Sequence, residues 1–273
     1  MFTVCFLSSV VRCQPLSRAL YVLIRISRKE VDMILDCSSY ESVKRSLCDA
    51  FHTTEEELIS VLKSVENDKQ IDYYTLEKNV ERAAREKLGE PDSELEILWF
   101  HATRVEDHKS FLEHGILTKS LVKDQLVQRL ASLASGLEKS GCNPFSLSMS
   151  GKNGDHDEGP FAFLIKVVAI QAPGSNHNYT DAPELVEDIA GTLLGNNYKE
   201  LVFRFQEITK PYLVSFTAKP RGDEVFKALF FLKLMVDGES ELDAGESANT
   251  FFNSNAEVIS PDRIKSLHNL ANV

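Results

Sequence analysis

The spacing of the apolar residues changes near residue 97, and this change most restricts the fold of the chain. Before that point, Val43, Leu47 and Phe51 recur four residues apart, as on one face of a helix. After it, short apolar runs such as Ile97–Phe100 have the length and composition of buried strands. Strands and helices do not alternate strictly in this second part, so a regular βαβ series is not expected. The sequence therefore predicts an α+β chain with an N-terminal helical segment.

The segment from Ser38 to Leu88 is predicted to form helices. Thr53 followed by Glu56 is typical of a capping box at a helix start. Gly89 suits the C-cap of the last of these helices, and Pro91 marks the exit of the chain. The segment is too small for a large core of its own, so we expect it to pack against the α+β part of the chain.

The first residues, Met1–Ser27, are apolar but are interrupted by Arg12, Arg18 and Arg25. A secretory signal carries its positive charge before the apolar run, and a membrane span needs about 20 residues with few charges. The stretch fits neither pattern, so we interpret it as a leader, an over-called start or a poorly ordered segment. A peripheral membrane anchor and an element docked on the body are the alternatives. The expected division is 1–32 for this leader, 33–92 for the helical segment and 93–273 for the α+β domain.

The α+β part is expected to contain both kinds of element in an irregular order. Two of the strands, 201–205 and 212–216, are expected to form a hairpin. Residues 238–249 are expected to form an acidic loop. A last short strand at 258–259 and a C-terminal helical turn are expected after it. The other expected strands are 97–100, 145–149 and 161–170, and the expected helices are 108–114, 119–140, 183–195 and 223–236.

Charge and cysteine content exclude some classes of function. The chain has 30 Lys and Arg against 41 Asp and Glu, for a net charge of −11. This balance argues against sequence-independent binding of nucleic acid, which depends on Lys and Arg, but it does not exclude a local basic pocket.

The chain has five cysteines, an odd number, and no two of them have C-x-x-C spacing. A zinc site or a disulfide framework is therefore not expected. We expect a reducing compartment, the cytoplasm.

Polar side chains with complementary chemistry follow the strand that ends at Phe100. They are His101, Thr103 and Arg104. An imidazole can bond a ribose hydroxyl, a threonine hydroxyl can bond an amide, and a guanidinium can hold a phosphate. The alternative is that Thr103 caps the next helix while Arg104 lies on the surface.

The run from Phe100 to Leu117 resembles the first motif of ADP-ribosyltransferase-fold proteins, in the histidine-containing branch of diphtheria toxin and the poly-ADP-ribosyltransferases. In that branch a strand ends in His-Gly-Ser/Thr, and a helix and a Gly-apolar pair follow. The resemblance implies that His101 bonds the nicotinamide ribose and that the backbone of the next residue, Ala102, grips the carboxamide, while Thr103 stands at the Ser/Thr position of the motif. Ala102 replaces the usual glycine. RNA 2′-phosphotransferases share the fold and a similar motif, so this motif alone does not determine the reaction.

The second motif of the family is a Gly-x-Tyr-Phe strand whose aromatic ring stacks on nicotinamide. Gly159–Phe163 resembles it loosely, with Phe161 at the tyrosine position. Phenylalanine can stack but lacks the hydroxyl. The Arg-dependent branch has a Ser-x-Ser strand there, which Ser146–Ser148 resembles. The alternative is that the phenylalanines belong to the core and the serines to a loop.

The third motif of the family is a glutamate at the start of a strand, where it polarises the ribose 2′-hydroxyl. Glu200, in the segment Tyr198–Phe203, is similar to the glutamate of the poly-ADP-ribosyltransferase hairpin. Glu257, before Pro261 and Ile264, is similar to that of the closing strand in many bacterial members. Both stay open, because either carboxylate serves if the fold brings it beside His101.

Two further groups of residues are candidates for metal sites. Asp155 to Glu158 could bind a divalent cation together with His177, but consecutive residues rarely converge on one ion, so a solvated acidic loop is expected. His101, His108 and His114 have no i, i+4 spacing and do not indicate a zinc site. We therefore expect no metal.

The resemblance implies an ADP-ribosyltransferase-like split β-sheet core over 93–273 and a site made of His101, Ala102, Thr103, Arg104, Phe161 and one of the two glutamates. The leading hypothesis is an NAD-dependent ADP-ribosyltransferase or NAD glycohydrolase of the bacterial toxin or defence type, with NAD as substrate. The alternatives are a catalytically inactive module that binds a nucleotide or a protein, and an enzyme similar to RNA 2′-phosphotransferases. The acceptor of the ADP-ribose and the oligomeric state do not follow from the sequence, and no membrane partner is expected.

Overall fold

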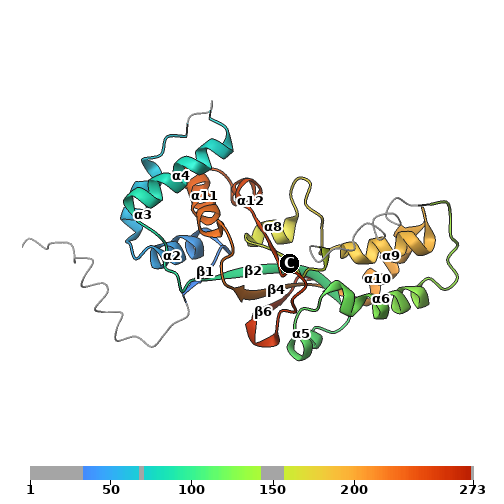
Figure 1. Cartoon of the computed structure of the whole chain (residues 1–273). Coiled ribbons are helices and arrows are strands. Elements are labelled where there is room, and N and C mark those ends of the chain that lie inside the picture. The colour runs from blue at the N-terminus through green and yellow to red at the C-terminus, as the bar shows by residue number, and fades with distance from the viewer. Residues whose placement is uncertain (1–32, 68–70, 143–156, 272–273) are drawn as a thin grey trace, which may run out of the picture. The chain divides into compact units, whose positions relative to one another are not determined.

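The computed structural model describes residues 33–67, 71–142 and 157–271 (Figure 1). Met33–Val273 forms one compact unit, in which the helical segment packs against the sheet. The leader at 1–32, the strand expected at 145–149 with its Ser146 and Ser148, and Asp155 and His156 of the expected acidic loop lie outside the described residues. Within the described ranges, no helix is both long and apolar enough to span a bilayer.

The N-terminal helical segment is confirmed, and side-chain caps begin its helices. Ser39, Thr54 and Asp72 each accept a hydrogen bond from the backbone N–H three residues later. The second cap is Thr54, one residue later than the expected Thr53, whose hydroxyl donates to Glu57 instead. The elements are β1 (Ile34–Leu35), α2 (Tyr40–Ala50), α3 (Glu55–Lys63) and α4 (Tyr73–Lys87).

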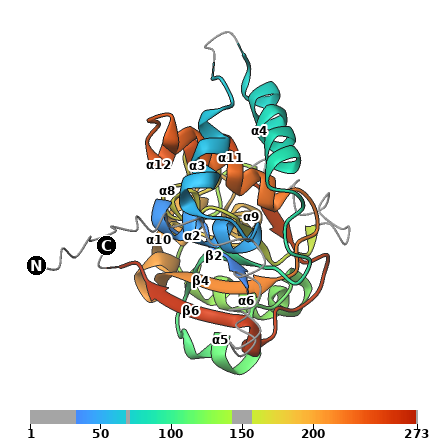
Figure 2. The same cartoon turned by 90° about the vertical axis from the view of Figure 1, so that its left-hand side faces the viewer.

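A mixed sheet lies beside these helices, and its central strand is β2 (Figure 2). The strand order is β5-β3-β2-β4-β6, with every neighbouring pair antiparallel, while β1 pairs in parallel with the start of β2. This sheet and the helical segment confirm the α+β class. The strands are β2 (Glu96–Val105), β3 (Phe161–Phe163), β4 (Lys210–Ala218), β5 (Phe251–Asn253) and β6 (Ile264–Asn269).

The remaining helices belong to two apolar clusters. The larger cluster joins α2, α3 and α4 to the sheet through α11, whose Phe230 and Phe231 are fully buried. The smaller cluster is formed by α6, α9 and α10 around Leu130 and Phe205. The helices are α5 (Lys109–His114), α6 (Lys119–Leu133), α8 (Lys166–Gln171), α9 (Glu184–Leu194), α10 (Tyr198–Ile208), α11 (Glu224–Val236), α12 (Glu241–Ala248) and the short 3₁₀ turn η2 (Pro261–Arg263).

Several expected elements were wrong, and one matters for the site. The hairpin strand expected at 201–205 is part of helix α10, because Leu201 and Phe205 share one helix face and pack into the smaller cluster. The long strand expected at 161–170 ends at Phe163, and α8 comes next. The acidic stretch at 238–249 contains α12. In place of the short strand expected at 258–259, Ile259 makes an isolated bridge to Ile116. The C-terminal helical turn that was expected next is strand β6.

Candidate functional site

Strand β2 carries the polar cluster within its length, not beyond its end as the sequence indicated. It runs on to Val105 and pairs with β4 at every residue from Ile97 to Val105. Because side chains alternate between the two faces of a strand, Trp99, His101 and Thr103 share one face. The sheet therefore fixes the spacing of His101 and Thr103.

The imidazole of His101 forms a bridge between β2 and β3. The two strands pair only at Phe100 and Phe163. Just beyond that pair, Nδ1 of His101 lies 2.7 Å from the carbonyl oxygen of Phe161. A carbonyl can only accept a hydrogen bond, so Nδ1 carries the proton in this contact. In the neutral ring, Nε2 is therefore left as an acceptor.

Partial burial favours the neutral form of this ring. The loss of surrounding water lowers the pKa of His101 from its ordinary value of 6.5, and the bond to Phe161 opposes this only in part. The imidazole therefore presents an unprotonated Nε2 at neutral pH. Such a nitrogen binds a hydroxyl or an amide N–H rather than an anion.

Further polar groups lie along the same face. Thr103 is paired across the sheet with Tyr212 of β4. The ring of Tyr212 stacks on His108 at a centroid distance of 5.4 Å, and Asn269 donates to the Tyr212 hydroxyl over 3.4 Å. The indole N–H of Trp99 is buried and has no hydrogen-bond partner in the part of the chain that the structure describes. Sequence reasoning did not place Tyr212 beside Thr103, because only the β2–β4 register reveals this pair.

Arg104 holds the fold together and does not present a free guanidinium. Its Nε donates to the Thr209 hydroxyl, and its two terminal nitrogens donate to the carbonyl oxygens of Thr180, Gln206 and Thr209 over 2.8 to 3.0 Å. Burial lowers the pKa of the guanidinium. Arg104 therefore ties the end of β2 to the end of α10, and the phosphate-holding role expected for it is not supported.

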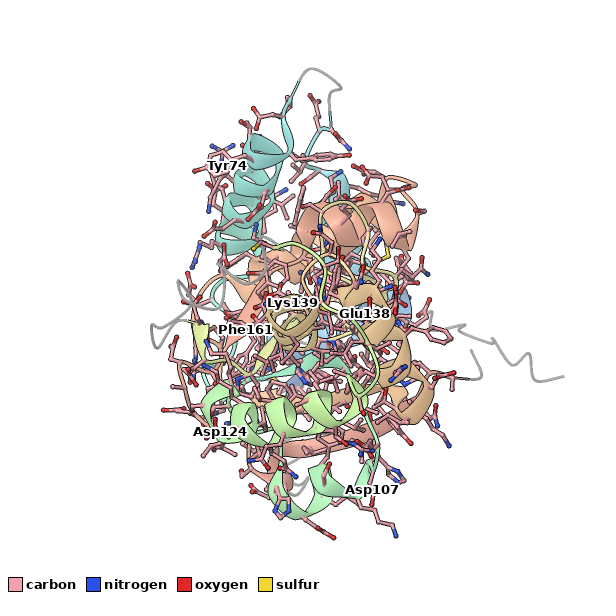
Figure 3. All side chains as sticks on the ribbon, turned by 90° about the vertical axis from the view of Figure 1, so that its right-hand side faces the viewer. Tyr74, Asp107, Asp124, Glu138, Lys139 and Phe161 are labelled. Carbon is pink, nitrogen blue, oxygen red and sulfur yellow. The ribbon has the colours of Figure 1, made fainter. Side chains whose placement is uncertain are left out.

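Ala102 and Phe161 lie on the other face of the sheet. Ala102 alternates with His101 and is buried. Phe163 is paired with Phe100, and Phe161 lies two residues before Phe163 on the same strand. Because side chains alternate along a strand, the ring of Phe161 is on the sheet face that does not carry the imidazole of His101. Phe161, labelled in Figure 3, is 38% exposed. Its carbonyl, not its ring, is the part that contacts His101.

Glu200 lies on a helix, and no described contact joins it to His101. It lies in the first turn of α10 and lines a cavity of about 460 Å³ with Phe203 and Arg204. Glu200 therefore does not open a strand, and it shares no described cavity with His101.

The carboxylate of Glu257 lies beside a guanidinium. Glu257 belongs to a loop before η2 and β6 rather than to the start of a strand, and it is exposed. Its Oε2 lies 3.7 Å from Arg221. At the start of this loop, Ser254 donates from its hydroxyl to Gly159 over 2.5 Å, and these residues adjoin β3. The loop therefore runs beside the strand that His101 contacts.

The groups considered for metal binding have other contacts. Glu158 accepts from the Ser120 backbone N–H over 2.8 Å and lies 3.7 Å from the Lys119 ammonium. His177 lies 2.6 Å from the Ala182 carbonyl oxygen. In the ranges that the structure covers, no three His, Cys, Asp or Glu side chains gather as metal ligands.

No protein-family model, no curated protein and no solved structure matches this chain.

Proposed function

We propose that this chain is a nucleotide-binding protein that holds the ribose of NAD, or of a related nucleotide, against His101 and Thr103. The observation that carries this proposal is the bond from His101 Nδ1 to the Phe161 carbonyl, which fixes the ring and leaves Nε2 as an acceptor. A ribose hydroxyl is a donor suited to that nitrogen, and the Thr103 hydroxyl can donate or accept beside it. The resemblance of Phe100–Leu117 to the first ADP-ribosyltransferase motif supports the same ligand.

The positions of the two glutamates favour binding without group transfer. When the bond between nicotinamide and ribose breaks, positive charge develops on the sugar, and a carboxylate beside it stabilises that charge. Glu200 lines a separate cavity, and the carboxylate of Glu257 pairs with Arg221. We therefore favour a catalytically silent relative of the ADP-ribosyltransferases.

An active ADP-ribosyltransferase or NAD glycohydrolase is the second candidate, and the position of the Glu257 loop favours it. In that reaction the bond from ribose C1 to nicotinamide breaks, nicotinamide leaves with the electron pair, and the oxygen of water or another acceptor group bonds to C1 and loses its proton to solvent. Glu257 would have to leave Arg221 to reach the sugar. A phosphotransferase acting on RNA is less well supported, because Arg104 donates to its own chain.

The test of binding is thermal unfolding with and without NAD. Because NAD binds only the folded state in this account, a hundredfold excess over Kd stabilises the protein by about 2.7 kcal/mol. His101→Ala should remove the shift while circular dichroism shows a folded protein. His114→Ala, at an exposed position on α5, is the matched control. Millimolar NAD without any shift, or an equal shift in His101→Ala, would contradict the proposal.

Release of nicotinamide separates the two candidates. The binding protein releases none above background. An enzyme releases it, and Glu257→Gln should then abolish release while Glu200→Gln, the same change on α10, leaves it intact.

A further inference from the structure

The outer face of α10 carries an aromatic ring between two opposite charges. Lys199, Phe203 and Glu207 are spaced four residues apart and are all exposed, so they form one row along the helix surface. Phe203 is 61% exposed, although the other side of α10 is buried in the smaller apolar cluster through Leu201 and Phe205. At 1.5 Å per residue, each charge lies about 6 Å along the helix axis from the ring. The row is therefore symmetric in spacing about Phe203 and opposite in charge at its two ends.

The cavity of about 460 Å³ that Glu200 lines lies beside this row. Leu137, which follows α6, also lines it. Arg204 holds this part of the surface in place, because its guanidinium donates to the carbonyl oxygens of Leu133 and Ser135 over 2.7 and 2.9 Å. The cavity is therefore built on a fixed contact between α10 and the end of α6, and its volume leaves room for an aromatic side chain.

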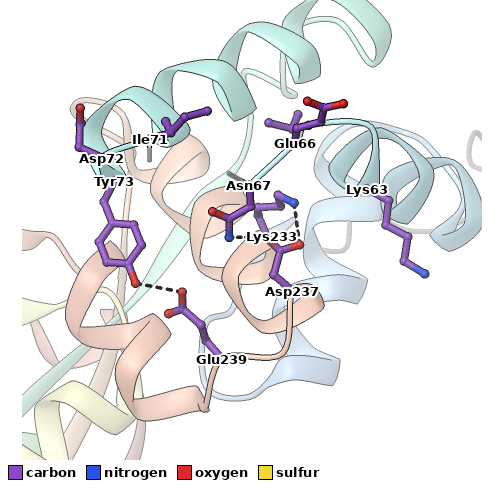
Figure 4. A pocket seen from close by; sticks show the side chains of 10 residues that line it. Lys63, Glu66, Asn67, Ile71, Asp72, Tyr73, Lys233, Asp237 and Glu239 are labelled. Carbon is purple, nitrogen blue, oxygen red and sulfur yellow. Dashed lines mark hydrogen bonds and ion pairs between the residues drawn. The ribbon is translucent and has the colours of Figure 1, made fainter. Parts of the chain in front are cut away.

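The two charges of the row have no ionic partner among the described residues. A larger cavity of about 800 Å³, between α3, α4 and the end of α11, shows the contrast (Figure 4). There the ammonium of Lys233 donates to Asp237 over 2.6 Å, and Asn67 donates to the same carboxylate over 2.7 Å. No such pair joins Lys199 or Glu207 to another described residue. Both charges are therefore available to a partner.

The order of these two charges does not stabilise α10 itself. Lys199 lies in the first turn and Glu207 in the last, whereas the helix dipole favours acidic residues at the start and basic residues at the end. In an antiparallel neighbour the order is reversed, so the start of one helix lies beside the end of the other. A second copy of the same helix therefore brings a glutamate to each lysine.

We propose that a second copy of this chain docks on this face, with the two α10 helices antiparallel about a twofold axis through Phe203. Lys199 of each copy pairs with Glu207 of the other, and the two Phe203 rings meet at the axis beside the cavities. Rows of side chains four residues apart are the surface by which helices most often pack. A twofold contact uses the same patch on both copies, as the symmetry of the row allows. The contact is independent of the nucleotide proposed for His101.

Sedimentation equilibrium of the full chain at physiological salt tests this proposal. Wild type should form dimers as the protein concentration rises. Lys199→Glu and Glu207→Lys should each weaken dimerisation about tenfold or more, because the twofold axis turns each change into two repulsive contacts. An equimolar mixture of the two variants should dimerise again, because every contact across the axis then joins a lysine to a glutamate. Recovery in the mixture also shows that both variants are folded.

Two controls separate this contact from overall charge and from general hydrophobic association. Glu207→Lys makes a chain of net charge −11 less negative, so association limited by overall repulsion would become stronger, not weaker. Phe203→Ser should weaken dimerisation about tenfold, whereas Tyr74→Ser, at a 71% exposed position on α4, should change it by less than about twofold.

Four results would each overturn the proposal. They are a wild type that stays monomeric at millimolar concentration, a stronger dimer in Glu207→Lys, equal effects of Phe203→Ser and Tyr74→Ser, and a mixture of folded charge variants that dimerises no better than its components. Circular dichroism checks the fold of each variant.

Discussion

At the scale of single residues, His101 and Arg104 show how neighbouring side chains on one strand take different roles. His101 uses one nitrogen to contact its own fold and keeps the other as an acceptor. Arg104 donates to the hydroxyl of Thr209 and to three carbonyl oxygens of its own chain. The sequence could point to His101, because the motif is local. It could not reveal the role of Arg104, because the acceptors at Thr180, Gln206 and Thr209 come from distant segments.

The lowered pKa of His101 predicts a pH dependence of stability. As the pH falls below about 6.5, the unfolded chain takes up a proton at this position before the folded protein does. This group therefore stabilises the fold fully above that pH, and the contribution is lost as the pH falls. Between pH 7.5 and 5.5, wild type should lose more free energy of unfolding than His101→Asn, as measured by urea denaturation. His114→Asn should behave as wild type, and an equal loss in His101→Asn and wild type would refute the prediction.

Arg104→Met should destabilise the protein by about 2 to 3 kcal/mol, because it leaves several carbonyl oxygens without a donor. The control is Arg129→Met, which breaks an exposed pair with Glu106 and should cost less than about 1 kcal/mol. Chemical denaturation measures both changes. If Arg104→Met were as stable as wild type and bound NAD more weakly, Arg104 would be a phosphate ligand after all.

At the scale of elements, the sequence predicted helices with long apolar stripes well and short apolar runs poorly. The helices at α9 and α11 are confirmed within a residue or two. The run at 201–205 was assigned to a strand because five residues cannot distinguish a buried strand from a helix face. Packing against α6 and α9 decides in favour of the helix, so Glu200 lies in a helix and not at the start of a strand. In the acidic stretch at 238–249, a helix-capping signal was overlooked. Ser240 accepts a hydrogen bond from the Asp243 backbone N–H and is the N-cap of α12.

The turn after α5 depends on a glycine. Gly115 has φ of +74°, and a Cβ there would lie 1.9 Å from the carbonyl oxygen of Ile259. Gly115→Ala should therefore displace the bridge from Ile116 to Ile259 and the end of the loop that carries Glu257. Gly89 is the control, because it has φ of +89° and a Cβ there would have no atom within 4 Å. Gly89→Ala should therefore destabilise the protein only through backbone strain, by about 1 to 2 kcal/mol.

Thermal and chemical denaturation should show that Gly115→Ala costs about 1 to 3 kcal/mol more than Gly89→Ala, because the close contact adds to the strain. Equal losses would mean that the neighbouring chain yields freely, and Glu257 would then not be held by this contact.

At the scale of the whole molecule, two apolar clusters stabilise the compact unit from Met33 onward. The larger one joins the N-terminal helices to the sheet, and the smaller one holds α6, α9 and α10 together. His101 lies on the strand whose start belongs to the first cluster and whose end is tied by Arg104 to α10. The face that carries His101 therefore depends on both clusters.

Alanine substitution should separate the clusters. Leu47 in α2 and Leu130 in α6 are both fully buried, so each change to alanine should cost about 2 to 5 kcal/mol. Hydrogen exchange should show that Leu130→Ala lowers protection mainly in α6, α9 and α10, whereas Leu47→Ala lowers it in α2, α3, α4 and the sheet. Uniform loss of protection in both variants would show one cooperative core instead.

The central claim is that the unprotonated Nε2 of His101 receives a hydroxyl of a bound nucleotide, and ¹⁵N NMR of histidine-labelled protein tests it most directly. The chain has seven histidines, and the signal that disappears in His101→Asn belongs to His101. Without ligand at pH 7, this signal should show the neutral ring with its proton on Nδ1. Addition of NAD should shift the Nε2 resonance of that histidine in the direction of a new hydrogen bond, with the other six as internal references. An unchanged His101 spectrum at saturating or millimolar NAD, or a ring protonated on Nε2, would contradict the account.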